Sequence, residues 1–202
     1  MKRYGKAADR DDPDAQYHLG LMYAEGMGVT QDYAAAMKWY RKAADHGLAQ
    51  AQYNLGVKFA KGEGVPKDSA EAVKWYRKAA EENYAEAQHW LGYCYAVGVG
   101  VATNYVEAVK WFRKAAEQGD AYGQNNLGLC YFLGNGLTLD YVEAVQWYRK
   151  AASADPLNGP TWNQLGYVEA YRRDLREART ALLEYARLAP RDANPIDSLG
   201  EV

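Results

Sequence analysis

The 202-residue chain contains few of the residues that catalytic and metal sites need. It has two cysteines, three histidines and three serines, and no Ser-x-x-Lys or Gly-x-Ser-x-Gly motif supplies a nucleophile with a base. His89 lies five residues before Cys94, but five residues along a helix turn by about 140°, so the two side chains would diverge. We therefore expect no enzymatic activity, no cofactor and no metal.

The chain also lacks an excess of one charge and a long apolar run. Its 24 basic and 26 acidic residues give a formal net charge of -2, which produces no general attraction for nucleic acid or an anionic membrane. No run approaches the roughly 18 apolar residues of a membrane span, and the N-terminus, MKRYGKAADRDD, has no apolar stretch typical of a secretion signal. We expect a soluble protein without nucleic-acid or membrane partners, and its compartment stays open.

Glycine, in contrast, is abundant and periodic. The stretches GMGV, GEGV, GVGV and GNGL begin at residues 26, 62, 98 and 134, an interval of 36 residues. The same interval separates four Leu-Gly pairs, which begin at Leu19, Leu55, Leu91 and Leu127, and four tryptophans, Trp39, Trp75, Trp111 and Trp147. A strict interval of this length indicates a repeat array, which fills roughly residues 9–154.

Each repeat is predicted to contain two helices. In DSAEAVKWYRKAAEEN, residues 68–83, Asp68 can cap a helix and Glu71 has the spacing of a capping-box partner. Gly47, Asn83 and Gly119 stand where a left-handed C-terminal cap belongs. The preceding stretch, AQYNLGVKFAKG at 51–62, predicts another helix that ends at the glycine loop.

Glycine also recurs inside these first helices, for example at Gly56, where it costs about 1 kcal/mol relative to alanine. We predict that a Cβ cannot fit there because the partner helix passes close by with small residues such as Ala72 or Ala79. The G-x-G loops themselves predict tight turns at positive φ. A dinucleotide loop would need a preceding strand and a third glycine, and that position holds Gln31, Lys67, Thr103 and Leu139.

Three recurring features have two readings each. The cysteines, Cys94 and Cys130, are interpreted as small buried hydrophobes, because stacked helices lie about 10 Å apart and a disulfide needs Cα atoms within about 7 Å. The tryptophan column is interpreted as packing between repeats, with a ligand slot as the alternative. Paired bases are interpreted as a solvated helix face, with a polyanion site as the alternative; they stand at Arg41/Lys42, Arg77/Lys78, Arg113/Lys114 and Arg149/Lys150.

Residues 15–44 follow the pattern A-x-x-x-L-G-x-x-Y-x-x-G-x-G-V-x-x-D-x-x-x-A-x-x-W-Y-x-K-A-A, which resembles the Sel1-like repeat, a relative of the tetratricopeptide repeat (TPR). After Ala152 the interval changes, and residues 162–190 resemble a divergent TPR, although Arg173 stands where the inter-helix glycine is expected. The resemblance implies an all-α fold, a right-handed α-solenoid of stacked antiparallel helix pairs.

The predicted organisation has four Sel1-like repeats in residues 1–154, preceded by a partial helix at 1–8. A TPR-like repeat follows at 155–190, and a further, truncated repeat begins at 191–202. Because RYGKAA at 3–8 aligns with WYRKAA at 39–44 and SLGEV at the other end opens a first helix, both ends look cut. We expect a fragment or an engineered chain, monomeric, with uncapped terminal repeats that allow end-to-end association.

The resemblance also implies a concave groove, lined by each first helix two positions before and two after its Leu-Gly leucine. These positions hold Tyr17 and Leu21, Tyr53 and Val57, His89 and Tyr93, Asn125 and Leu129, and Asn163 and Tyr167. Asn54, Asn126 and Gln164 match asparagine-type positions of chaperone-tail-binding TPR domains, but no lysine occupies the paired positions, so no carboxylate clamp is expected.

These residues suit an extended peptide. The predicted function is therefore a non-catalytic scaffold that binds a peptide or protein segment. Two alternatives stay open. The tyrosines could only support packing between repeats, or the chain could be a structural or engineered hybrid module with no ligand of its own.

Overall fold

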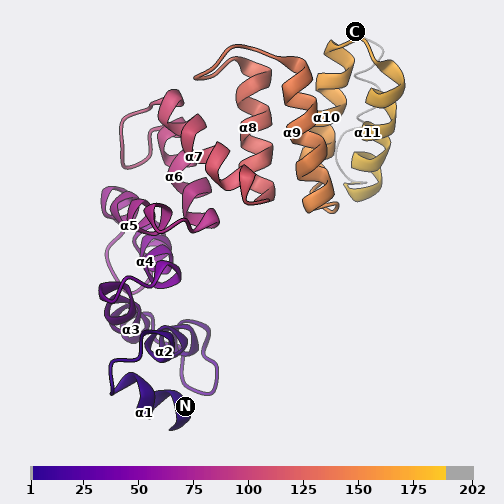
Figure 1. Cartoon of the computed structure of the whole chain (residues 1–202). Helices are drawn as coiled ribbons and strands as arrows, with labels where there is room; N and C mark the ends of the chain where they lie inside the picture. The colour runs from indigo at the N-terminus through magenta and orange to yellow at the C-terminus, as the bar shows by residue number, and fades with distance from the viewer. Residues whose placement is uncertain (1, 190–202) are drawn as a thin grey trace. The chain divides into compact units, whose positions relative to one another are not determined.

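The structure is a computed structural model and describes residues 2–189; the truncated repeat predicted at 191–202 lies outside this range. Within the described range every regular element is an α-helix, and consecutive helices are joined by short turns (Figure 1). The helices are α1 (Lys2–Ala8), α2 (Pro13–Glu25), α3 (Tyr33–Asp45), α4 (Ala49–Lys61), α5 (Ser69–Glu81), α6 (Ala85–Val97), α7 (Tyr105–Glu117), α8 (Ala121–Leu133), α9 (Tyr141–Ala154), α10 (Gly159–Tyr171) and α11 (Leu175–Leu188). The predicted all-α architecture of stacked helix pairs is confirmed.

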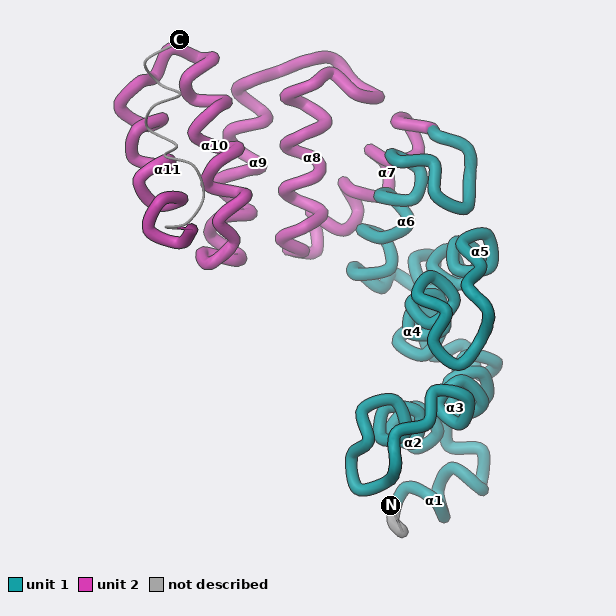
Figure 2. The backbone as a smooth tube through the Cα atoms, turned by 180° about the vertical axis from the view of Figure 1, so that it is seen from behind, with its two compact units in different colours: residues 1–103 teal, residues 104–202 magenta. Residues whose placement is uncertain are grey.

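The chain divides into two compact units, residues 1–103 and residues 104–202 (Figure 2). The first contains α1 to α6 and the second contains α7 to α11. Inside each unit, every helix packs on the helix that follows it in the chain. None of the described helices is long and apolar enough to traverse a lipid bilayer.

The second helix of each repeat starts at the predicted cap. The Asp68 carboxylate accepts a hydrogen bond from the Glu71 amide at 2.9 Å, and Asp32, Asn104 and Asp140 do the same in their repeats. The second hydrogen bond of the predicted capping box, from the Asp68 N–H to the Glu71 carboxylate, is not formed. The Asp68 N–H donates to the Phe59 carbonyl, 2.9 Å away, and the Glu71 carboxylate pairs with Lys74. The backbone bond therefore ties the end of the glycine loop to the helix that precedes it.

The two glycines of each loop are required for different structural reasons. Gly62 ends α4 with φ +76°, the left-handed conformation that a helix C-terminus favours. Gly64 has φ +77°, and a Cβ there would also lie 2.5 Å from the carbonyl carbon of Tyr33. The second glycine thus allows the loop to touch the backbone where the second helix of the preceding repeat begins.

Glycine inside the first helices faces a large side chain, which corrects the predicted partner. A Cβ on Gly56 would lie 2.6 Å from the Tyr76 ring and 3.2 Å from the Ala72 carbonyl oxygen. Gly20 meets Tyr40 and Gly128 meets Tyr148 in the same way, whereas Gly166 of the fifth pair meets Leu182. The prediction that a Cβ cannot fit is confirmed; the Tyr76 ring fills most of the space, and the predicted Ala72 contributes its carbonyl oxygen.

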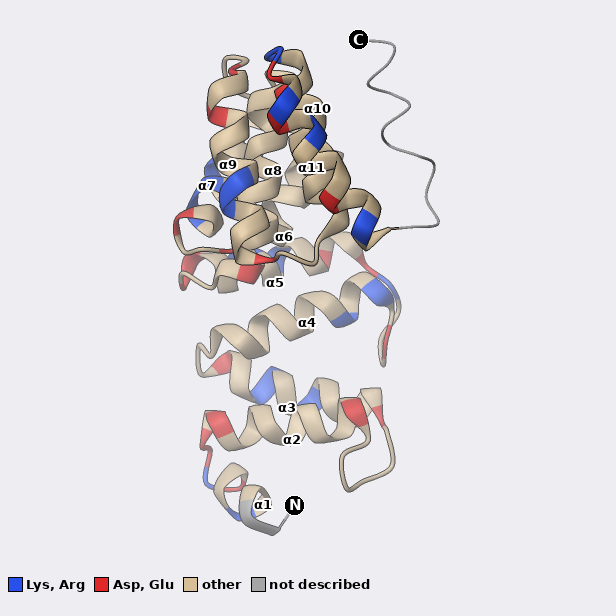
Figure 3. Ribbon diagram, turned by 90° about the vertical axis from the view of Figure 1, so that its right-hand side faces the viewer, with Lys and Arg blue, Asp and Glu red and all other residues tan. Residues whose placement is uncertain are grey.

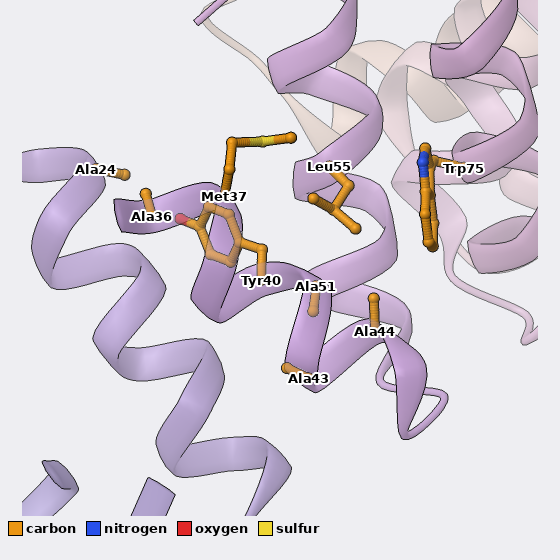
Figure 4. Close-up of a cluster of buried hydrophobic side chains, with 9 residues drawn as sticks. All are labelled: Ala24, Ala36, Met37, Tyr40, Ala43, Ala44, Ala51, Leu55 and Trp75. Carbon is orange, nitrogen blue, oxygen red and sulfur yellow. The ribbon is translucent and has the colours of Figure 1, made fainter. Parts of the chain in front are cut away.

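The core of the first unit is shared between repeats. Figure 4 shows one cluster in which side chains from four consecutive helices meet. It consists of Ala24, Ala36, Met37, Tyr40, Ala43, Ala44, Ala51, Leu55 and Trp75. Trp75 is 7% exposed, so the interpretation of this tryptophan as packing between repeats is confirmed. The second unit has a comparable cluster, Ala144, Val145, Tyr148, Leu165, Val168 and Ala181.

A glutamine near the start of the first helix joins neighbouring repeats in α2, α4, α6 and α8. The Gln88 side chain is 1% exposed, and its Nε2 donates to the Ala80 carbonyl at 3.1 Å. Gln16, Gln52 and Gln124 reach the corresponding carbonyls of the second helices before them. Each of these carbonyls also accepts a backbone N–H from the turn, as Ala80 does from Asn83 at 3.2 Å, so the glutamine adds a second hydrogen bond at the helix end.

The paired bases of the second helices have partners within the array. Charged residues of both signs are spread over the helices of each unit (Figure 3). Arg77 donates to the Tyr95 hydroxyl, and the Lys78 ammonium lies 4.1 Å from the centre of the Trp75 ring. In the second unit Arg113 donates to the Tyr131 hydroxyl. Most of the paired bases are exposed, as expected for a solvated helix face, and Arg77 and Arg113 are half-buried against their tyrosine partners.

The helix pair α10 and α11 continues the array with altered chemistry. Arg173 occupies the position of the missing glycine and adopts φ +63°, so the turn forms without a glycine. Glu169 is 1% exposed and pairs with Arg149 and with Arg172, both at 2.8 Å. A buried carboxylate therefore replaces the tyrosine hydroxyl that accepts from Arg77 and from Arg113.

Candidate functional site

The residues predicted to line a groove in the first unit lie on its first helices. Tyr17 and Leu21 are on α2, Tyr53, Asn54 and Val57 are on α4, and His89 and Tyr93 are on α6. Tyr93 is 41% exposed, and the five predicted residues on α2 and α4 are half-buried. His89 is 8% exposed, so it contributes packing rather than surface, and burial lowers its pKa to about 4.

Tyr17 and Tyr53 belong to a polar and aromatic cluster that bridges neighbouring repeats. The Asn54 amide donates to the Tyr17 hydroxyl at 3.4 Å. The Tyr53 ring lies 5.4 Å from the ring of Tyr84, the residue before α6. Desolvation raises the pKa of the Tyr17 phenol and that of Tyr84, the latter to about 12. Both phenols are therefore protonated at neutral pH and able to donate hydrogen bonds.

Trp90 lies beside the predicted residues and was not among them. Its ring stacks on that of Tyr76 at 6.3 Å and meets the edge of Tyr93 at 5.6 Å, and the side chain is 38% exposed. The 36-residue interval could have found it, because Trp90 occupies in its repeat the position that Asn54 and Asn126 hold in theirs. Only the residue type differs, an indole in place of an amide.

Trp90 and Tyr93 form one side of a cavity of about 120 Å³ in the first unit. Residues from α4, α5, α6 and the two glycine loops line it: Ala60, Lys67, Ser69, Ala72, Tyr76, Trp90, Tyr93, Cys94 and Val99. The Cys94 thiol is free, and burial raises its pKa to about 11, so it is a neutral part of the wall. Cys130 is also free and buried, which confirms the interpretation of both cysteines as small buried side chains.

In the second unit the predicted positions carry amides. Asn125, Asn126 and Leu129 are on α8, and Asn163 and Tyr167 are on α10. The Thr161 hydroxyl donates to the Asn125 side-chain oxygen at 3.1 Å. The side-chain oxygens of Asn163 and Gln164 are buried and accept no hydrogen bond from the described residues. Tyr167 is 40% exposed. The Asn163 and Gln164 oxygens therefore lie below the surface, which exposes the Tyr167 phenol.

Neither surface gathers a set of groups typical of catalysis. Within residues 2–189, no three histidine, cysteine or acidic side chains come together as metal ligands would. What the two surfaces do offer is apolar contact, phenol donors and amide oxygens, which are the groups that engage a peptide backbone and its side chains.

The Sel1 repeat model matches the sequence four times, at residues 13–48, 49–84, 85–120 and 121–156. Among solved structures, a protective antigen of uropathogenic Escherichia coli strains with an SLR fold has a TM-score of 0.90 at 38% identity. That match covers 100% of this chain and 43% of the antigen, so the chain spans less than half of the antigen's length.

Two further structures resemble the chain. A Sel1 repeat protein from Oxalobacter formigenes has a TM-score of 0.80 at 40% identity, over 88% of this chain and 74% of that protein. YrrB, described as a TPR protein with an unusual peptide-binding site, has a TM-score of 0.63 at 17% identity, over 98% of each chain, and shows likeness of fold alone. A search of curated proteins found no match.

Proposed function

Because the chain belongs to the Sel1 repeat family, we propose that it is a non-catalytic scaffold whose first helices bind an extended peptide or protein segment. The observation that carries this proposal is the row of partly exposed tyrosines and amides on consecutive first helices. Tyr17 and Tyr53 are half-buried, and Tyr93 is 41% exposed. Rings fixed on one face by packing bury apolar area on binding at little cost in side-chain entropy.

Hydrogen-bonding capacity supports the same proposal. An extended peptide presents a backbone N–H and a carbonyl at almost every residue, and each needs a partner when it is desolvated. The protonated phenols of Tyr17 and Tyr84 supply donors in the first unit. In the second unit, Tyr167 is 40% exposed and supplies a further phenol. YrrB, whose fold resembles this one, is described as having a peptide-binding site.

The test is capture of a partner from the source cell by the full chain and by the double variant Tyr53→Ala/Tyr93→Ala. We expect at least one reproducible partner whose binding falls about tenfold or more in the variant, since truncating two central aromatic contacts typically removes a few kcal/mol. Circular dichroism checks that helicity is retained. Tyr105→Ala is the matched control, because Tyr105 is 42% exposed but begins a second helix.

The alternative is a structural module with no ligand of its own. It predicts that the chain and its double variant retain the same proteins in equal amounts. Equal binding by the two would remove the assignment of this surface, and loss in the Tyr105→Ala control would show that the effect is not local to the first helices.

A further inference from the structure

The cavity beside Trp90 has walls suited to one apolar side chain. The rings of Tyr76, Trp90 and Tyr93 face it, and Ala72 and the neutral Cys94 thiol add apolar surface. A cavity of about 150 Å³ with apolar walls holds a benzene molecule. The volume here is about 120 Å³, which suits an aliphatic side chain better than a large aromatic one.

The charge at the cavity distinguishes between ligands. Aromatic walls by themselves also attract cations, including ammonium groups. Lys67, however, lines the cavity, and no ion pair with a described residue neutralises it. The adjacent carboxylate, Asp68, is engaged in capping α5. A second cation would be repelled at this position, whereas a carboxylate would be attracted.

Resting on the proposed function, we propose that this cavity receives a leucine-sized aliphatic side chain from the bound segment. The residue that follows it in the segment carries a carboxylate, which pairs with Lys67. This contact is separate from a carboxylate clamp on the first helices, because Lys67 belongs to the loop before α5. The partner is thus defined as an acidic segment with an aliphatic anchor.

The experiment uses the full chain with ¹⁵N-labelled tryptophan and three acetylated, amidated pentapeptides. The first is Gly-Leu-Asp-Glu-Gly, the second replaces leucine by alanine, and the third replaces both acids by lysine. The Trp90 indole signal is assigned with Trp90→Phe. We expect the first peptide to shift this signal saturably, and we expect the other two to bind at least fivefold more weakly.

Two variants test the residues. Lys67→Glu should reverse the preference, so that the lysine peptide binds better than the acidic one. Tyr93→Ala should weaken the acidic peptide at least fivefold. The matched control is Lys61→Glu, since Lys61 ends the neighbouring helix without lining the cavity, and it should change binding less than twofold.

Equal binding of the leucine and alanine peptides would overturn the proposal, as would an unchanged charge preference in Lys67→Glu. Preference for the lysine peptide by the unaltered chain would identify the cavity as a cation site instead. Failure here is distinguishable from failure of the scaffold proposal. A partner that is lost in Tyr53→Ala/Tyr93→Ala but retained in Lys67→Glu keeps the scaffold and removes only the acidic anchor.

Discussion

The same repeat position can differ in burial from one copy to the next, and His89 is the example. His89 stands at a repeat position that holds Tyr17, Tyr53 and Asn125 in the other copies, yet it is the one fully buried among these four. Burial disfavours the charged imidazole and lowers its pKa from 6.5 to about 4. A repeated position therefore does not imply a repeated role.

The histidine makes stability depend on pH. Between pH 6.5 and pH 4 the unfolded chain binds a proton at His89 that the folded chain does not, so stability falls as the pH falls through this window. Urea unfolding at pH 7.0 and pH 4.5 should show this loss, and His89→Gln, which cannot titrate, should lose about 2 kcal/mol less. Equal losses in the two proteins would mean that the imidazole is protonated in the folded chain.

Among the helices, the junction between α9 and α10 differs most from the others. At the α5–α6 and α7–α8 junctions an arginine of the second helix donates to a tyrosine hydroxyl, Arg77 to Tyr95 and Arg113 to Tyr131. Here Arg149 reaches the buried Glu169, which Arg172 also neutralises. A buried carboxylate is stable only while its partners remain, and removing one side of such a pair is costly.

Glu169→Ala should lower the free energy of unfolding by about 2–3 kcal/mol, because Arg149 and Arg172 lose their contact with Glu169 and a packed side chain is removed. Arg149 keeps its pair with Glu177 at 3.2 Å. Arg149 is about half exposed, which places the value below that of a fully buried pair. Tyr131→Phe is the matched change at the preceding junction and should cost about 1 kcal/mol or less. Thermal and urea unfolding measure the loss of unfolding free energy in each variant. Equal losses would show that the ion pairs of Glu169 stabilise the fold no more than the neutral hydrogen bond of Tyr131.

For the molecule as a whole, stability is distributed through contacts between successive helices. The core cluster of the first unit takes side chains from α2 through α5, so no repeat there completes its core alone. Such arrays unfold more easily at their ends, where an element packs on a neighbour at one side. The helix α1 has seven residues and its main contact is with α2.

Amide hydrogen exchange, followed by mass spectrometry, should therefore become slower from α1 toward the middle of the first unit. Amides of α1 are expected to exchange at least tenfold faster than those of α4, which packs between α3 and α5. Leu55→Ala, which opens the shared core at a residue with 0% exposure, should accelerate exchange in α3 and α5 as well as in α4. Acceleration confined to α4 would contradict a shared core.

Most of the fold could be predicted because its signals are local. Caps such as Asp68 and left-handed glycines such as Gly62 act within a few residues of chain, and the structure places the helices accordingly. The 36-residue interval repeats these local signals in register. The candidate surface was predicted only as a set of positions. Which of those positions are open depends on side-chain volume in the adjoining repeat.

By itself the sequence determined the helix pairs, their number in residues 13–156 and the turns between them, since backbone preferences and capping need only nearby residues. Tertiary structure alone decided that Gly56 faces the Tyr76 ring, that His89 is buried and that Lys67 joins Trp90 around one cavity. Those outcomes require close packing of side chains from separate helices, and the shape left between packed helices is not encoded at any one position.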